Sequence, residues 1–124
     1  MNHGRLPQQF RDRTKAFASG VIRLYVELPK TREEVRILGK QLLRSGTSVA
    51  AHVREASRAR SDAEFVAKIE GAAQEADESQ LWLELLRDSC GIHSTSIDAL
   101  LSETDELIAI LGTMASRTKA NNGT

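Results

Sequence analysis

The stretch from Arg44 to Leu86 constrains the fold most, because small and apolar residues recur there at helical spacing on both sides of one break. At the break, Ser61 precedes Glu64 by three residues. This is the spacing of a capping box, in which a hydroxyl and a carboxylate bond the free amides at the start of a helix. The pattern predicts two long helices joined by a tight turn.

Downstream of the break, one face of the predicted helix is apolar or small throughout. Its spacings alternate between three and four residues, as in a helix packed into a bundle, and the face comprises Phe65, Ile69, Ala72, Ala76, Ser79, Leu83, Leu86 and Cys90. Gly91 follows, where a C-cap would end the helix. We therefore expect one helix over about 62–90.

Upstream of the break, we expect a helix over about 32–60, starting at a second capping box made by Thr31 and Glu34. The middle of its packing face is small or polar, and the facing helix offers Gly71 and its neighbouring alanines. Small residues on both sides permit close approach of the two backbones. We predict a tight polar waist formed by Ser45, Ser48, His52, Glu55, Lys68 and Glu75.

The outer helices are predicted over about 10–28 and 96–117. Pro29 stops the first, and Thr95 with Asp98 offers a capping box to the second. Residues 1–9 read as a flexible arm, 10–118 as the bundle and 119–124 as a frayed tail. Short connections favour an all-α, up-down-up-down antiparallel four-helix bundle.

The two halves of the chain carry opposite charge. Residues 1–60 hold thirteen Lys or Arg against five Asp or Glu, and residues 61–124 hold four against twelve. Basic residues of the first half recur four positions apart, which is unfavourable on an isolated helix. Their partners would be the protein's own carboxylates, those of a neighbouring subunit, or phosphates. The candidate phosphate contacts are Arg11, Lys15, Arg36, Lys40, Arg44, Arg54 and Arg58.

The sequence offers little for catalysis. A di-iron bundle needs repeated Glu-x-x-His motifs, which are absent, and Cys90 is the only cysteine. An enzymatic role would rest on the polar waist alone, so we expect no catalytic residue, cofactor, metal site or small-molecule substrate. No apolar run approaches the roughly 20 residues of a membrane span, and the N-terminus lacks a signal-peptide core. We expect a cytoplasmic protein without membrane contact.

Three motifs carry a family resemblance: RSGTSVAA in the second helix, SDAEF with the later EADES and WLELL in the third, and ETDELIAIL in the fourth. Over about Phe10 to Lys119 the chain resembles the four-helix-bundle proteins encoded in intervening sequences of bacterial 23S rRNA genes. His52 is a departure, because the family pattern implies Asn at this position.

That family is similar in fold to the accessory proteins of diversity-generating retroelements. The resemblance implies a homopentameric ring that binds RNA or DNA and a reverse transcriptase. Trp82 either completes the bundle or anchors a subunit interface, and the frequency of aromatic residues at interface hot spots favours the interface. Two functions remain open: a non-enzymatic scaffold associated with nucleic acid, or a purely structural oligomer or protein adaptor.

Overall fold

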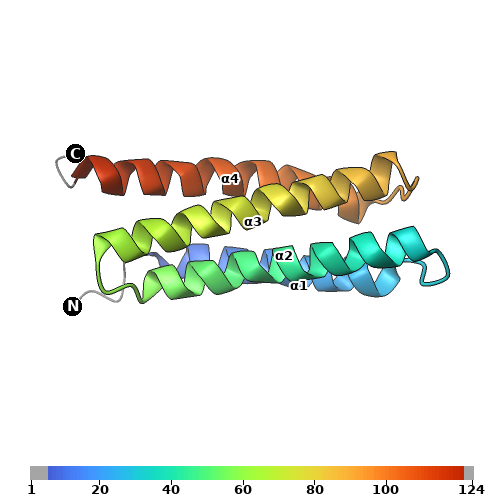
Figure 1. The fold of residues 1–124 in the computed structure, drawn as a ribbon, viewed down its shortest axis with the longest axis horizontal. Coiled ribbons are helices and arrows are strands. Elements are labelled where there is room, and N and C mark those ends of the chain that lie inside the picture. Colours follow the sequence, from blue (N-terminus) through green and yellow to red (C-terminus); the bar gives the residue numbers. More distant parts are fainter. Residues whose placement is uncertain (1–5, 122–124) are drawn as a thin grey trace.

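The computed structural model of the protein describes residues 6–121. Four helices run antiparallel to their chain neighbours (Figure 1), which confirms the predicted up-down-up-down bundle. They are α1 (Gln8–Glu27), α2 (Glu33–Ser57), α3 (Asp62–Asp88) and α4 (Thr95–Asn121). No helix in this described part of the chain is both long and apolar enough to cross a membrane.

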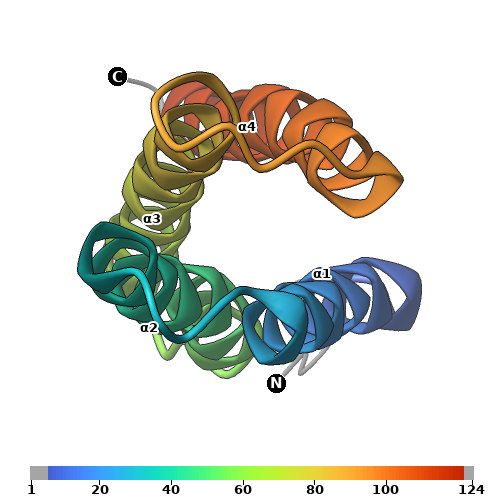
Figure 2. The ribbon, with the colours of Figure 1, turned by 90° about the vertical axis from the view of Figure 1, so that its right-hand side faces the viewer.

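The helices follow one another around the bundle in chain order, as the end-on view in Figure 2 shows. The contact between α2 and α3 is the most extensive and that between α1 and α4 the least. Arg13 of α1 links these two least-contacting helices, because its guanidinium donates to two carboxylates of α4: to Glu103 at 2.7 and 2.8 Å and to Glu106 at 2.6 Å. The bonds to Glu103, and secondarily to Glu106, raise the pKa of Arg13 above its ordinary value.

The core follows the predicted apolar face of α3, whose residues are all buried. In α1 a stripe from Phe10 to Leu24 is buried in the same way. In α4, Leu100 and Leu107 belong to the core, whereas Leu101 and Ile108 are only partly buried. Helix α4 packs against α1 as well as α3, so its buried face is turned toward both neighbours.

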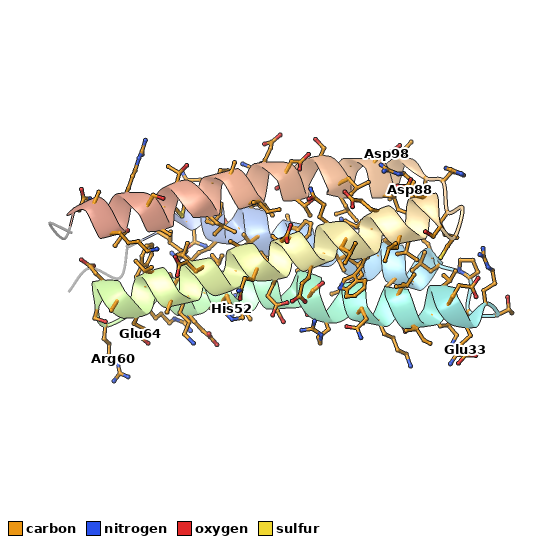
Figure 3. The ribbon with its side chains drawn as sticks, turned by 45° about the horizontal axis from the view of Figure 1, so that its top comes forward. Glu33, His52, Arg60, Glu64, Asp88 and Asp98 are labelled. Atoms are coloured by element: carbon orange, nitrogen blue, oxygen red, sulfur yellow. The ribbon has the colours of Figure 1, made fainter. Side chains whose placement is uncertain are left out.

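The predicted turn at the break is confirmed. Ser61 Oγ accepts a hydrogen bond from the Glu64 amide at 3.0 Å, and the Glu64 carboxylate accepts one from the Arg60 amide at 2.9 Å. Arg60 and Glu64 lie together at this end of the bundle (Figure 3). At the opposite end, Gly91 has a φ of 71°, the left-handed backbone that glycine adopts without strain.

The other two predicted capping boxes are wrong. Helix α2 has Arg32 as its N-cap, with no side-chain cap hydrogen bond, so Thr31 does not cap it. At α4, Ser94 rather than Thr95 accepts the hydrogen bond, from the Ile97 amide at 3.1 Å. At the start of α4, Ser94, Thr95 and Ser96 are adjacent hydroxyl residues, and sequence spacing does not decide which of them caps the helix.

Most helix bounds lie within two residues of the expected ones, and the ends of α2 and α4 differ by more. Helix α2 ends at Ser57 rather than residue 60, because hydrogen bonds between residues three apart tighten its last turn. Helix α4 runs to Asn121, past the expected end at 117. Helix α1 starts at Gln8, and Leu6 is 2% exposed and part of the core, so the predicted arm is wrong there. Residues 1–5 and 122–124 lie outside the described residues.

Candidate nucleic-acid interface

A groove of about 670 Å³ lies between the first half of α1 and the last turns of α2. Four of the seven candidate phosphate contacts line it together with small and polar residues. The full lining is Gln8, Arg11, Asp12, Lys15, Ala50, Ala51, Arg54, Glu55 and Arg58.

Local sequence explains why the four cations converge. Each follows a buried residue of its helix by one position, which places it beside the core face rather than opposite it. The spacing of four within each pair then stacks Arg11 over Lys15 and Arg54 over Arg58. Because α1 and α2 are antiparallel, the start of one helix meets the end of the other, and the two pairs face each other across the groove.

The cations of the groove are not neutralised by carboxylates. Within residues 6–121, the side chains of Lys15, Arg54 and Arg58 take part in no ion pair or hydrogen bond. Arg11 donates from Nη2 to the neutral Gln8 amide oxygen at 2.6 Å. Its Nε is buried and has no hydrogen-bond partner. A buried donor without an acceptor is costly.

The two carboxylates in the groove face other partners. Asp12 accepts a hydrogen bond from Gln8 Nε2 at 2.9 Å. Glu55 pairs with Lys68 of α3 at 3.1 Å, so its charge is already compensated from outside the groove. Four cations therefore share the groove with one uncompensated carboxylate, which leaves a local excess of positive charge.

The other three candidate contacts divide into two kinds. Arg44 pairs with Glu78 at 2.9 Å and lies 3.6 Å from Glu75, so the acidic hairpin of the protein itself neutralises it. Arg36 and Lys40 are exposed and have no side-chain partner in the described chain. The structure thus leaves six of the seven candidate contacts without a carboxylate partner.

The polar waist consists of separate contacts rather than one network. The buried Ser45 and Ser79 hydroxyl oxygens lie 2.7 Å apart. His52 Nδ1 lies 2.9 Å from the carbonyl oxygen of its own helical neighbour Ser48. Because a carbonyl only accepts, Nδ1 carries the proton. No group of three or more His, Cys, Asp or Glu side chains in residues 6–121 is placed to hold a metal ion.

Trp82 is half-buried and packs against the core, with its indole Nε1 buried and without a hydrogen-bond partner in the described chain. The structure also shows exposed apolar residues that sequence reasoning missed. On the basic hairpin these are Ile22, 45% exposed, Val26, 69% exposed, and Ile37, 51% exposed. Each interrupts an otherwise polar helix face, which was the available signal in the sequence.

The comparisons with known proteins agree with this architecture. The family model of the 23S rRNA-intervening sequence protein matches residues 8–113. A crystal structure of a protein of unknown function from the S23 ribosomal protein family of Bacteroides thetaiotaomicron is 32% identical, with a TM-score of 0.76 over 85% of this chain and 96% of that one. No curated protein sequence matches significantly. The chain belongs to the 23S rRNA-intervening sequence protein family.

Proposed function

We propose that the protein is a non-enzymatic, oligomeric cytoplasmic scaffold that associates with nucleic acid through its basic hairpin. The observation that carries this function is the groove between α1 and α2, where four cations converge without carboxylate partners. Phosphates are the ligands that such a groove suits, because they bring negative charge and accept several hydrogen bonds.

A simpler role for part of the groove is helix stabilisation. Arg54 lies in the last turn of α2, and Arg58 just beyond it, where the helix dipole favours cations by about 0.3–1 kcal/mol each. This effect does not extend to Arg11 and Lys15, which lie in the first half of α1, away from its C-terminal end. The helix dipole therefore does not account for all four cations of the groove, and this favours a ligand role.

The resemblance in sequence supports assembly into a ring, with five subunits as the expected number and a reverse transcriptase as a candidate protein partner. Each subunit would supply only a few phosphate contacts, and a ring would multiply them through effective concentration. Binding would depend strongly on salt and little on base sequence.

A second candidate function is self-assembly without nucleic acid. Exposed Ile22 and Val26 lie on the basic hairpin, and the acidic hairpin offers carboxylates such as Asp77 and Glu84. A head-to-tail ring would join two such different surfaces of neighbouring subunits. In that case the cations of the groove would bind a neighbour's carboxylates instead of phosphates.

Light scattering with absorbance at 260 and 280 nm separates the two functions. At low salt, a scaffold of the proposed kind elutes with nucleic acid, and about 0.5 M salt, where the Debye length is only about 4 Å, strips it away. The Arg54→Ala, Arg58→Ala double variant should elute free of nucleic acid at unchanged oligomer mass. An Arg23→Ala, Arg117→Ala variant, with the same loss of charge elsewhere, should retain it.

Two results would contradict nucleic-acid association. One is wild-type protein free of nucleic acid at low salt that also fails to bind added nucleic acid. The other is equal retention by the groove variant and its charge-matched control. A ring that dissociates in salt, and in the groove variant, would favour the self-assembly function.

A further inference from the structure

We propose that the outer face of α2 binds a double-stranded nucleic acid along about one helical turn, with the groove as one phosphate seat and Arg36 with Lys40 as the other. This inference rests on the proposed function and adds the form of nucleic acid that the face recognises. It depends on a spacing along α2 and on the chemistry of the surface between the two seats.

The two basic pairs of α2 are in line. Eighteen positions separate Arg36 from Arg54, and the same number separates Lys40 from Arg58. Eighteen residues make five complete α-helical turns, so within α2 Arg54 repeats the direction of Arg36 at a rise of about 27 Å. Arg36, Lys40 and Arg54 thus project from one side of α2, toward the side where α1 contributes Arg11 and Lys15, and Arg58, one residue past the end of α2, lines the same groove.

This spacing fits the repeat of a duplex. A rod lying along a double helix meets the phosphates of one strand on the same side once per turn, which is about 34–36 Å in B-form DNA. Between corresponding members of the two pairs the rise is about 27 Å, and long Lys and Arg side chains reaching outward at both seats span the remaining difference. Both seats can therefore reach the same strand, one turn apart.

The surface between the seats carries no free charge. On this side of α2 the intervening residues include Leu43, Thr47 and Ala50, all partly buried and neutral. Arg44 lies in the same stretch, but its side chain pairs with carboxylates of α3. A neutral middle between two basic ends matches a duplex whose groove, rather than its phosphates, faces the centre of α2.

Single strands are disfavoured by the composition of the groove. Proteins that bind single strands without sequence preference stack bases on aromatic side chains, and no aromatic residue lines the groove. Tyr25, on the same hairpin, is covered by the Lys30 ammonium, 4.8 Å from the ring centroid. The groove can therefore contact only the phosphate backbone of a nucleic acid. A duplex presents about twice the phosphate density of a single strand, so it is the better ligand.

Fluorescence anisotropy on the full chain tests this geometry with two labelled hairpins, of 5 and 12 base pairs, made as DNA and again as RNA. The shorter stem reaches one seat and the longer reaches both. The logarithm of the affinity should fall with the logarithm of salt concentration by about 0.9 per phosphate contact. Four contacts in the groove predict a slope of about −3.6 for the short stem, and two more predict about −5.4 for the long one.

Arg36→Ala with Lys40→Ala distinguishes the two seats. This variant should lower the slope for the long stem by about 1.8 and leave the short stem unchanged. The charge-matched Arg23→Ala, Arg117→Ala control should alter neither. An equal effect of the Arg36 and Lys40 substitutions on both stems, or single strands bound as tightly as the long stem, would overturn duplex binding along α2 while leaving nucleic-acid association intact. Absence of binding to every probe at low salt would instead remove the proposed function.

Discussion

Gly71 of α3 lies directly against the imidazole of His52 on α2. A Cβ added at Gly71 would be 2.7 Å from His52 Cδ2 and 3.0 Å from Nε2, closer than ordinary contact allows. His52 lies in the seam between these helices (Figure 3), and the hydrogen bond from its Nδ1 to Ser48 holds the ring in place. Because the His52 ring fills this space, only glycine, which has no side chain, fits at position 71.

Gly71→Ala is expected to destabilise the protein. The alanine gains about 1 kcal/mol of helix propensity, but overpacking against the fixed ring costs about 1–3 kcal/mol. The net loss should be about 1 kcal/mol in the free energy of unfolding, measured by urea denaturation. Gly112→Ala is the matched control, because nothing lies within 4 Å of a Cβ there, and it should stabilise by about 0.5–1 kcal/mol.

The sign of the Gly71 substitution should reverse when His52 is removed. In a His52→Ala background the clash is absent, so Gly71→Ala should stabilise by up to about 1 kcal/mol. The same urea titrations complete the double-mutant cycle. Additive effects of the two substitutions would show that the ring and the glycine are not coupled.

The buried hydroxyl pair of the waist should also behave as a unit. Ser79 donates to the Glu75 carbonyl at 2.8 Å, so the hydrogen between the two hydroxyls comes from Ser45. Ser79→Ala should cost about 1 kcal/mol, because Ser45 keeps only a long 3.4 Å contact to the Leu42 carbonyl. The double alanine variant should cost less than the sum of the single ones, and thermal unfolding measures this. A fully additive result would contradict the pairing.

Arg13→Ala should loosen the contact between α1 and α4. The guanidinium bonds two carboxylates of α4, but its side chain is 34% exposed and therefore screened. A loss of about 1 kcal/mol is expected, smaller in 1 M salt. Hydrogen exchange should show the loss as faster opening of α1. Arg23→Ala, on the same helix, should leave exchange unchanged.

Arg44→Ala should change nucleic-acid affinity by less than about twofold, because its charge is already paired within the chain. Arg54→Ala with Arg58→Ala should weaken binding at least about tenfold at 0.1 M salt, since two charge-assisted contacts are lost. Fluorescence anisotropy on one duplex compares the two variants. A loss for Arg44→Ala as large as for the double variant would show that the α3 carboxylates release Arg44 to the ligand.

Helical periodicity made the bundle predictable from sequence, because stripes such as Phe65 to Cys90 leave one way to bury apolar surface. The groove was only partly predictable. Spacing identifies Arg11 with Lys15 and Arg54 with Arg58 as pairs on single helices. That the pairs face each other depends on the register between α1 and α2, which no local pattern encodes.

The same limit explains what sequence reasoning missed. Arg44 resembles Arg36 and Lys40 in spacing, yet its place toward α3 lets Glu78 neutralise it. Gln8 and Asp12 line the groove, but polar residues at the start of a helix are common and carry no distinguishing signal. Rotation of each helix about its own axis decides these roles, and the rotation follows from the packing of the whole bundle.

Arginine side-chain NMR tests whether the groove between α1 and α2 holds phosphates. The Nε–H signal of each arginine in nitrogen-15-labelled protein, assigned through Arg→Lys variants, can be followed while a 12-base-pair duplex is added. Signals of Arg11, Arg54 and Arg58, the three arginines that line the groove, should shift together and saturate. Those of Arg13 and Arg23 should stay in place. Unmoved groove signals in a sample where the duplex is shown to be bound would contradict the claim that this groove holds phosphates.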